Sequence, residues 1–127
     1  MTRYDPMKPL DHEAWKELGE TEQFELVERF HKKIRAQTGN ARLHATIHVI
    51  VENQVALGDE IPVAAAFARL QREGLDRHDA IHAIGSKLIV HMQEVASGLR
   101  DGKGGDINAI YYRELAALTA RTWREQG

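Results

Sequence analysis

The sequence predicts an all-α protein, a compact bundle of about five helices with no sheet. Three observations carry this prediction. Apolar residues recur at steps of three and four along most of the chain, which is the period of an amphipathic helix. Capping residues stand before these segments, and glycines stand after them. No segment alternates between apolar and polar residues for long enough to form a half-buried strand.

The first predicted helices lie within residues 11–38. Asp11 can cap a short helix that Gly19 closes. Thr21 can cap a longer helix that ends at Gly39, because glycine is common just after a helix. The longer helix has a single apolar stripe, which consists of Phe24, Val27, Phe30 and Ile34. A stripe on one side predicts a helix that covers the core with that side.

The next predicted helix, residues 42–57, is apolar on most of its sides. Its larger apolar residues are Leu43, Ile47, Ile50, Val51 and Val55. Because little polar surface remains for solvent, we expect this helix to be the central and most buried one. Pro62 then opens a short packing helix, since a proline is tolerated in the first turn, and Gly74 closes it.

Asp76 can cap the following helix, with Asp79 placed three residues later like the partner in a capping box. This helix ends at residues 97–98, and its core stripe consists of Ile81, Ile84, Leu88 and Val95. A glycine-rich loop, residues 101–105, leads to a last helix at residues 106–125. The loop is no phosphate-binding loop, because no strand precedes it and no Lys-Ser or Lys-Thr pair follows it.

The length and composition restrict the class of protein. A chain of 127 residues fits a single domain, residues 1–127. The absence of cysteine excludes disulfides, thiolate nucleophiles and cysteine-based metal sites. The net charge of −2 argues against a protein that binds nucleic acid through its phosphates. The first six residues lack the apolar region of a secretory leader, and no apolar run reaches roughly 18–20 residues. We therefore expect a cytoplasmic protein that does not bind membranes.

Four of the seven histidines form two matched pairs. His44 and His48 are four residues apart on the central helix, and His78 and His82 are four apart on the helix that Asp76 caps. Residues at this spacing share one helix face, so each pair can chelate one ion. If the two helices lie side by side, four imidazoles form a set suited to a divalent zinc, iron or nickel ion.

Glu52 continues the face of the first histidine pair, four residues beyond His48. It lies about 12 Å along the helix axis from His44, which is too far for one ion to bind all three side chains. We expect Glu52 at the edge of the histidine cavity, where it could bind a second ion or orient a ligand. Ligating histidines normally donate their other ring nitrogen to a carboxylate or carbonyl, and Asp79 is another candidate for that role.

Two alternatives to a single metal site remain open. In the first, the protein is a metal-free interaction or regulatory module that contacts a protein partner or a second copy of itself. The histidines would then join Glu52, Asn53 and Gln54 in a buried hydrogen-bond network that fixes the helix register. Three adjacent polar side chains on an apolar helix need such partners if they are buried.

The second alternative is a carboxylate-bridged di-iron oxidase. Its sequence support is Glu28-x-x-His31 together with the weaker Asp79-x-x-His82, because such bundles use a Glu-x-x-His step on two helices. The remaining carboxylates would come from Glu52, Glu94 or Glu114. None of these patterns indicates which reaction the protein would catalyse. His91 lies about 180° around the helix from His82, so we expect it away from the histidine face.

Two longer motifs surround the histidine pairs: LHATIHVIVENQ at residues 43–54 and GLDRHDAIHAIGS at residues 74–86. Together they resemble a bacterial family known as domain of unknown function 1841. The resemblance covers roughly residues 40–98, and His91 falls where relatives often have a histidine. It implies a helical domain that occurs alone or as a C-terminal module, to which residues 11–38 and 106–125 add helices. It implies no reaction and no catalytic residue.

Overall fold

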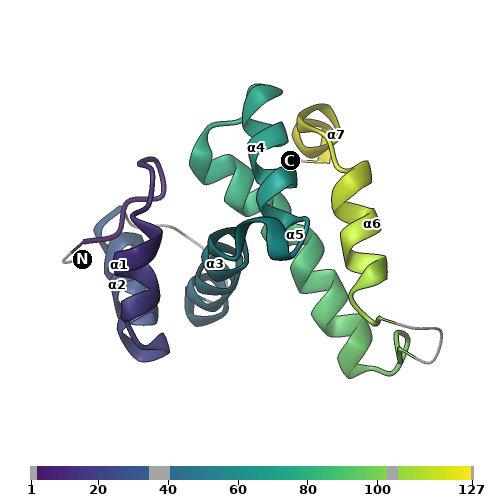
Figure 1. Cartoon of the computed structure of the whole chain (residues 1–127), viewed down its shortest axis with the longest axis horizontal. Helices are drawn as coiled ribbons and strands as arrows, with labels where there is room; N and C mark the ends of the chain where they lie inside the picture. The colour runs from purple at the N-terminus through teal and green to yellow at the C-terminus, as the bar shows by residue number, and fades with distance from the viewer. Residues whose placement is uncertain (1–2, 35–40, 103–105, 127) are drawn as a thin grey trace.

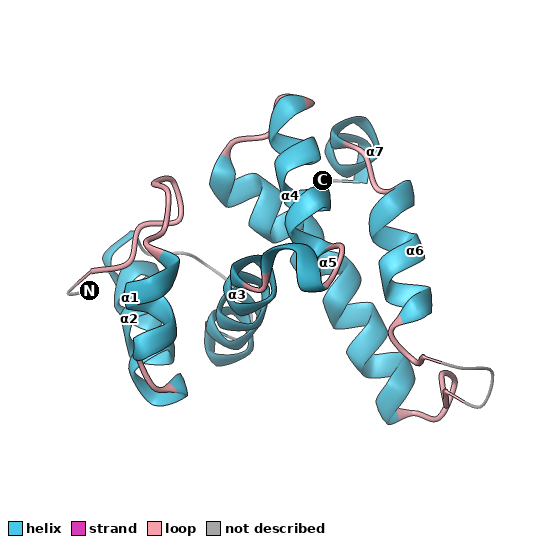
Figure 2. Cartoon of the chain, viewed as in Figure 1, coloured by secondary structure: helices cyan, strands magenta, loops and turns pink. Residues whose placement is uncertain are grey.

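The computed structural model describes residues 3–34, 41–102 and 106–126, which form an all-α fold without strands (Figures 1 and 2). Most of the described residues lie in helices, which confirms the predicted fold class. The elements are α1 (His12–Glu17), α2 (Glu20–Ile34), α3 (Ala41–Ala56), the short 3₁₀ turn η1 (Gly58–Glu60), α4 (Val63–Arg72), α5 (Arg77–Ala96), α6 (Ala109–Ala117) and α7 (Ala120–Gln126). None of the helices in the described ranges has the length and apolar character needed to cross a membrane.

Helix α3 lies at the centre of the molecule, with α1 and α2 on one side and α4 and α5 on the other (Figure 1). Ile47 and Val51 are 6% and 0% exposed, and Ile50 is half-buried. The prediction of a central, buried helix is therefore confirmed. Its sequence is apolar on most sides because it packs against helices on two sides.

Two separate apolar clusters lie against α3. One cluster joins α3 to α4, α5 and α6 and includes Val51, Leu70, Ile81, Ile84 and Leu115. The other joins α3 to the N-terminal arm, α1 and α2 and includes Tyr4, Trp15, Val27, Ala45 and Val49. Because α3 contributes to both clusters, two of its polar side chains, His48 and Glu52, are buried.

Several predicted helix boundaries are formed as expected. Asp11 accepts a hydrogen bond from the backbone of Ala14 at 3.2 Å, and Asp76 accepts one from Asp79 at 2.7 Å. Helix α4 begins directly after Pro62. The predicted cap Thr21 is wrong, because α2 begins at Glu20 and Thr21 lies in its first turn. The predicted end at Gly39 lies outside the described residues, as does part of the glycine-rich loop.

The single helix predicted for residues 106–125 is wrong, because the chain forms two helices there. At Leu118 the backbone is extended, with ψ of 132°, and α7 begins two residues later. The hydroxyl of Thr119 accepts a hydrogen bond from the backbone of Thr122 at 3.1 Å, as an N-cap does. The backbone of Ala120 also donates to Glu73 at 2.9 Å, which ties the start of α7 to the end of α4.

Helices α3 and α5 approach each other closely at Gly85. A Cβ atom placed on this residue would lie 2.8 Å from Cγ2 of Ile47, which is closer than real Cβ contacts. The missing side chain therefore sets the distance between the two helices. Ile47 precedes His48, and Gly85 lies three residues after His82, so this contact also positions the histidine faces.

Candidate metal centre

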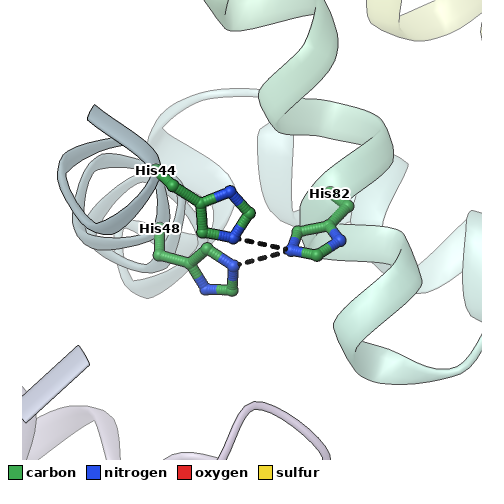
Figure 3. A group of neighbouring side chains, drawn as sticks. All are labelled: His44, His48 and His82. Atoms are coloured by element: carbon green, nitrogen blue, oxygen red, sulfur yellow. Dashed lines mark hydrogen bonds between the residues drawn. The ribbon is translucent and has the colours of Figure 1, made fainter. Parts of the chain in front are cut away.

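Three histidines from two helices present their Nε2 atoms to one another (Figure 3). Nε2 of His82 on α5 lies 3.2 Å from Nε2 of His44 and 2.9 Å from Nε2 of His48, both on α3. The nitrogens of this group that could ligate an ion all lie within 4.8 Å of one another. Two nitrogens bound to one tetrahedral ion lie about 3.3 Å apart, so the observed separations are close to those of shared ligands. The two faces predicted from the sequence meet.

His78, the fourth predicted ligand, packs beside this group. Its ring centroid lies 4.2 Å from that of His82 and 5.2 Å from that of His48. The edge of the ring also meets Phe30 of α2, with centroids 5.6 Å apart. All four predicted histidines are therefore neighbours, whereas the converging nitrogens come from His44, His48 and His82.

Glu52 faces Arg77 instead of the histidine cavity. Nη1 and Nη2 of Arg77 donate to the two carboxylate oxygens at 2.7 and 2.8 Å. Glu52 is 0% exposed and Arg77 is 7% exposed. Burial lowers the pKa of Arg77, but the hydrogen bonds and charge of Glu52 outweigh it, and the pKa is raised. The expected position of Glu52 at the cavity edge is wrong, because a buried carboxylate needs a paired cation.

Tyr4 connects this ion pair to His48. Its hydroxyl donates to Oε2 of Glu52 at 2.6 Å and lies 3.2 Å from Nδ1 of His48. Burial, and then the charge of Glu52, raise the pKa of Tyr4 well above its usual value, so the phenol keeps its proton. The hydroxyl has one proton, and it forms the hydrogen bond to Glu52. The phenol oxygen can therefore only accept from His48, so Nδ1 of His48 must be the donor. Nε2 of His48 then carries the lone pair that a metal ligand needs.

Tyr4 therefore has the orienting role for which Asp79 was a candidate. Asp79 is exposed in the first turn of α5, where its backbone bonds to the cap. Sequence reasoning also missed Arg77. A signal for Arg77 existed, because a buried acid on an apolar helix requires a cation and Arg77 stands beside His78. Tyr4 lies in an arm without periodicity, and no local pattern links it to its partners.

The polar residues after Glu52 bond to other helices. Asn53 accepts from the indole of Trp15 at 2.8 Å and donates to Gln23 at 2.9 Å. Gln54 accepts from the hydroxyl of Tyr111 at 2.7 Å. Part of the predicted buried hydrogen-bond network therefore exists, but Asn53 and Gln54 use it to join α3 to α1, α2 and α6.

The carboxylates that a di-iron site would need lie elsewhere. Glu94 and Glu114 both pair with Arg100, at 2.6 and 2.9 Å. Nη1 of Arg100 also lies 2.7 Å from Nδ1 of His91. No carboxylate joins the histidine nitrogens within the described residues. The side chain of His31, part of the other predicted motif, lies outside the described part of the structure.

A partly open cavity of about 230 Å³ lies directly beside the three histidines. Its remaining lining residues come from α3, α5 and α7 and are Ile47, Ile81, Gly85, Ser86, Ile89 and Trp123. Apart from the histidines, none of them is ionisable. Three protein ligands leave one position of a tetrahedral ion open, and here that position has an apolar cavity as its neighbour.

Comparison of the chain with family models, with curated proteins and with solved structures gave no match. The resemblance to domain of unknown function 1841 stays a prediction from two motifs. Fold and site together define the class: an all-α protein with a cluster of three histidines that could hold a metal ion.

Proposed function

We propose that the protein binds one divalent zinc, iron or nickel ion through Nε2 of His44, His48 and His82. The observation that carries this proposal is the convergence of the three atoms, with separations of 2.9 and 3.2 Å from His82. The ligands come from the rigid helices α3 and α5, whose spacing Gly85 sets. Such a site needs little rearrangement to accept an ion.

The hydrogen bonds around His48 give independent support. Tyr4, held by Glu52, requires Nδ1 of His48 to carry the proton. The buried Arg77 holds both carboxylate oxygens of Glu52 in place. This arrangement orients His48 in the way that the surroundings of ligating histidines normally do.

The donor atoms favour a particular group of metals. The converging group contains imidazole nitrogens and no oxygen ligand among the described residues, which disfavours magnesium and calcium. Three histidines with one open position are typical of catalytic zinc sites. Nickel and iron also accept imidazole ligands, so the choice among the three metals needs measurement.

The test is the metal content of protein purified without an affinity tag, followed by zinc titration of the metal-free protein. His48→Ala should lower zinc affinity at least tenfold, because it removes one of three ligands. His12→Ala is the control, since His12 lies on α1 outside the cluster. A wild-type protein that binds none of the three metals would end the proposal.

A metal-free interaction or regulatory module is the second candidate. The observation that favours it is that the contacts of His82 with His44 and His48 also have hydrogen-bond lengths. In that case His48→Ala would cost about 1–3 kcal/mol by leaving a buried partner unpaired. The melting temperature of the wild type would not respond to zinc, nickel or iron, and the partner would be another protein or a second copy.

A further inference from the structure

We propose that the cavity beside the three histidines binds a small monoanion with an apolar body, whose anionic group completes the coordination of the metal. The inference rests on the proposed metal site and adds the chemical class of its ligand. It follows from the charge balance of the site, the lining of the cavity and its size.

The charge balance calls for an anion. Three neutral imidazoles around a divalent ion leave two positive charges beside an apolar wall, which is costly without compensation. The described cavity lining contains no carboxylate. Glu52, the acid next along the histidine face, already accepts two hydrogen bonds from Arg77 and is neutralised by it. An anionic donor at the open position therefore supplies charge that the described site lacks.

The residues that line the cavity favour a ligand with an apolar body and a single charge. Ile47, Ile81, Ile89 and Trp123 form walls from three helices. The hydroxyl of Ser86 donates to the carbonyl oxygen of Ala83 at 2.7 Å, so its proton is already in use. The lining offers no lysine or arginine for a second anionic group. A dianion would therefore lose hydration at its second charge without gaining a partner.

The size of the cavity limits the body to a few carbon atoms or one ring. Ser86 lies four residues after His82, so the space left by its small side chain adjoins the His82 ring. An apolar protein cavity of about 150 Å³ is large enough for benzene. The cavity here measures about 230 Å³, which leaves room for a phenyl group next to the metal.

The experiment uses the full chain loaded with Co²⁺, whose visible absorption reports changes in coordination. Acetohydroxamate and benzohydroxamate bind metals through the same anionic group and differ in their apolar body. Benzohydroxamate should bind at least tenfold more tightly. Benzamide, which lacks the anionic donor, and 4-carboxybenzohydroxamate, which adds a second charge, should each bind at least tenfold more weakly than benzohydroxamate.

Two variants locate the effect in the cavity. Ser86→Leu fills the space next to His82 and should remove the preference for benzohydroxamate while Co²⁺ and acetohydroxamate still bind. Gln93→Leu is the matched control, because it adds the same side chain at an exposed position of α5. Ile89→Ala removes part of the apolar wall and should weaken benzohydroxamate at least threefold, with acetohydroxamate unchanged.

The outcomes separate the two proposals. If Co²⁺ binds and both hydroxamates bind equally well, the metal site stands and the ligand inference is overturned. Equal weakening of both hydroxamates by Ser86→Leu also overturns the inference, because the cavity would then not hold the ligand body. If Co²⁺ itself does not bind to the wild type, the proposed metal site fails first, and the ligand inference fails with it.

Discussion

Two regions of the molecule combine the same four residue types in a different order. The Arg77 network consists of Arg77, Glu52, Tyr4 and His48, and the Arg100 network consists of Arg100, Glu114, Tyr111 and His91. In the first, a tyrosine stands between the charged pair and the histidine. In the second, the arginine contacts the histidine directly, 2.7 Å from Nδ1.

This difference in order fixes the chemistry of the two rings. Arginine can only donate, so Nδ1 of His91 accepts and its Nε2 donates to Asn108 at 3.1 Å. The ring also stacks on Tyr111, with centroids 5.3 Å apart. Both nitrogens of His91 are thus occupied, next to a cation that repels metal ions. In His48, Nδ1 donates to the phenol oxygen of Tyr4, so the lone pair of Nε2 points toward Nε2 of His82.

Burial alone does not distinguish a candidate ligand from a structural histidine. His48 and His91 are 1% and 5% exposed, so their exposure is nearly the same. What differs is the nitrogen that carries the proton and the group that contacts Nδ1, which is a neutral phenol at His48 and a guanidinium at His91.

The largest expected effect is on stability. Arg77→Met leaves the carboxyl group of Glu52 buried without its partner, which should cost about 3–5 kcal/mol of unfolding free energy. Arg100→Met should cost less, because Glu94 and Glu114 are 36% and 32% exposed and can be hydrated. Urea unfolding of both variants measures the difference. Equal losses would show that burial does not separate the two networks.

The second effect is the response to zinc. At a zinc concentration 100 times the dissociation constant, the wild type should gain about 2.7 kcal/mol of stability. His82→Ala should abolish this gain, since it removes the imidazole that contacts both α3 histidines. His91→Ala should retain it. Melting curves of both variants with and without zinc measure this response. A lost response in His91→Ala would contradict the conclusion that His91 is not a metal ligand.

Gly85→Ala tests the helix spacing. The new Cβ would lie 2.8 Å from Ile47, so α3 and α5 must shift apart. We expect a loss of about 1–3 kcal/mol and at least tenfold weaker zinc binding. Gly19→Ala is the control, because no atom lies within 4 Å of its added Cβ. Calorimetric zinc titration measures the affinity, and an unchanged value would mean that this contact does not position the histidines.

Tyr4→Phe tests the orientation of His48. Without the phenol oxygen, Nδ1 of His48 loses the acceptor that fixes its proton. Zinc affinity should fall about 10–100-fold, as is typical when the partner of a ligating histidine is removed. Nitrogen chemical shifts of the ring should show a mixture of tautomers. Tyr112→Phe, at a half-buried tyrosine of α6, should change neither property.

The smallest expected effect is a loss of stability at alkaline pH. Burial raises the pKa of Tyr111 above its usual value of 10.0. Since the folded pKa exceeds the unfolded one, this contribution to stability is complete below pH 10 and is lost as the pH rises further. Between pH 9 and 11 the wild type should lose roughly 1 kcal/mol more than Tyr111→Phe. Urea unfolding at each pH checks this, and parallel losses would contradict it.

Much of the fold was accessible from the sequence because its signals are local. Capping aspartates and apolar periods predicted the helices, and the spacing of His44 and His48 predicted their common face. The break between α6 and α7 was missed because Leu115 and Leu118 fit one continuous stripe. The Thr119 cap that begins α7 is a local signal that could have revealed it.

The centre itself was only partly predictable. Each histidine pair follows from its helix, but the meeting of the pairs depends on the close approach of Gly85 to Ile47, between different helices. The position of Glu52 was mispredicted because its face was considered without a distant cation. The sequence separation of Glu52 and Arg77 is 25 residues, and no helical period connects them.

The docking of the N-terminal arm has a consequence for the order of events during synthesis. The carbonyl oxygen of Pro6 accepts a hydrogen bond from Arg77, which follows it by 71 residues. The arm, α1, α2 and α3 therefore emerge from the ribosome before the cation that secures them. Until α5 emerges, Glu52 has no counter-charge and one apolar side of α3 is uncovered, so a chaperone has its best opportunity to bind the nascent chain in that interval.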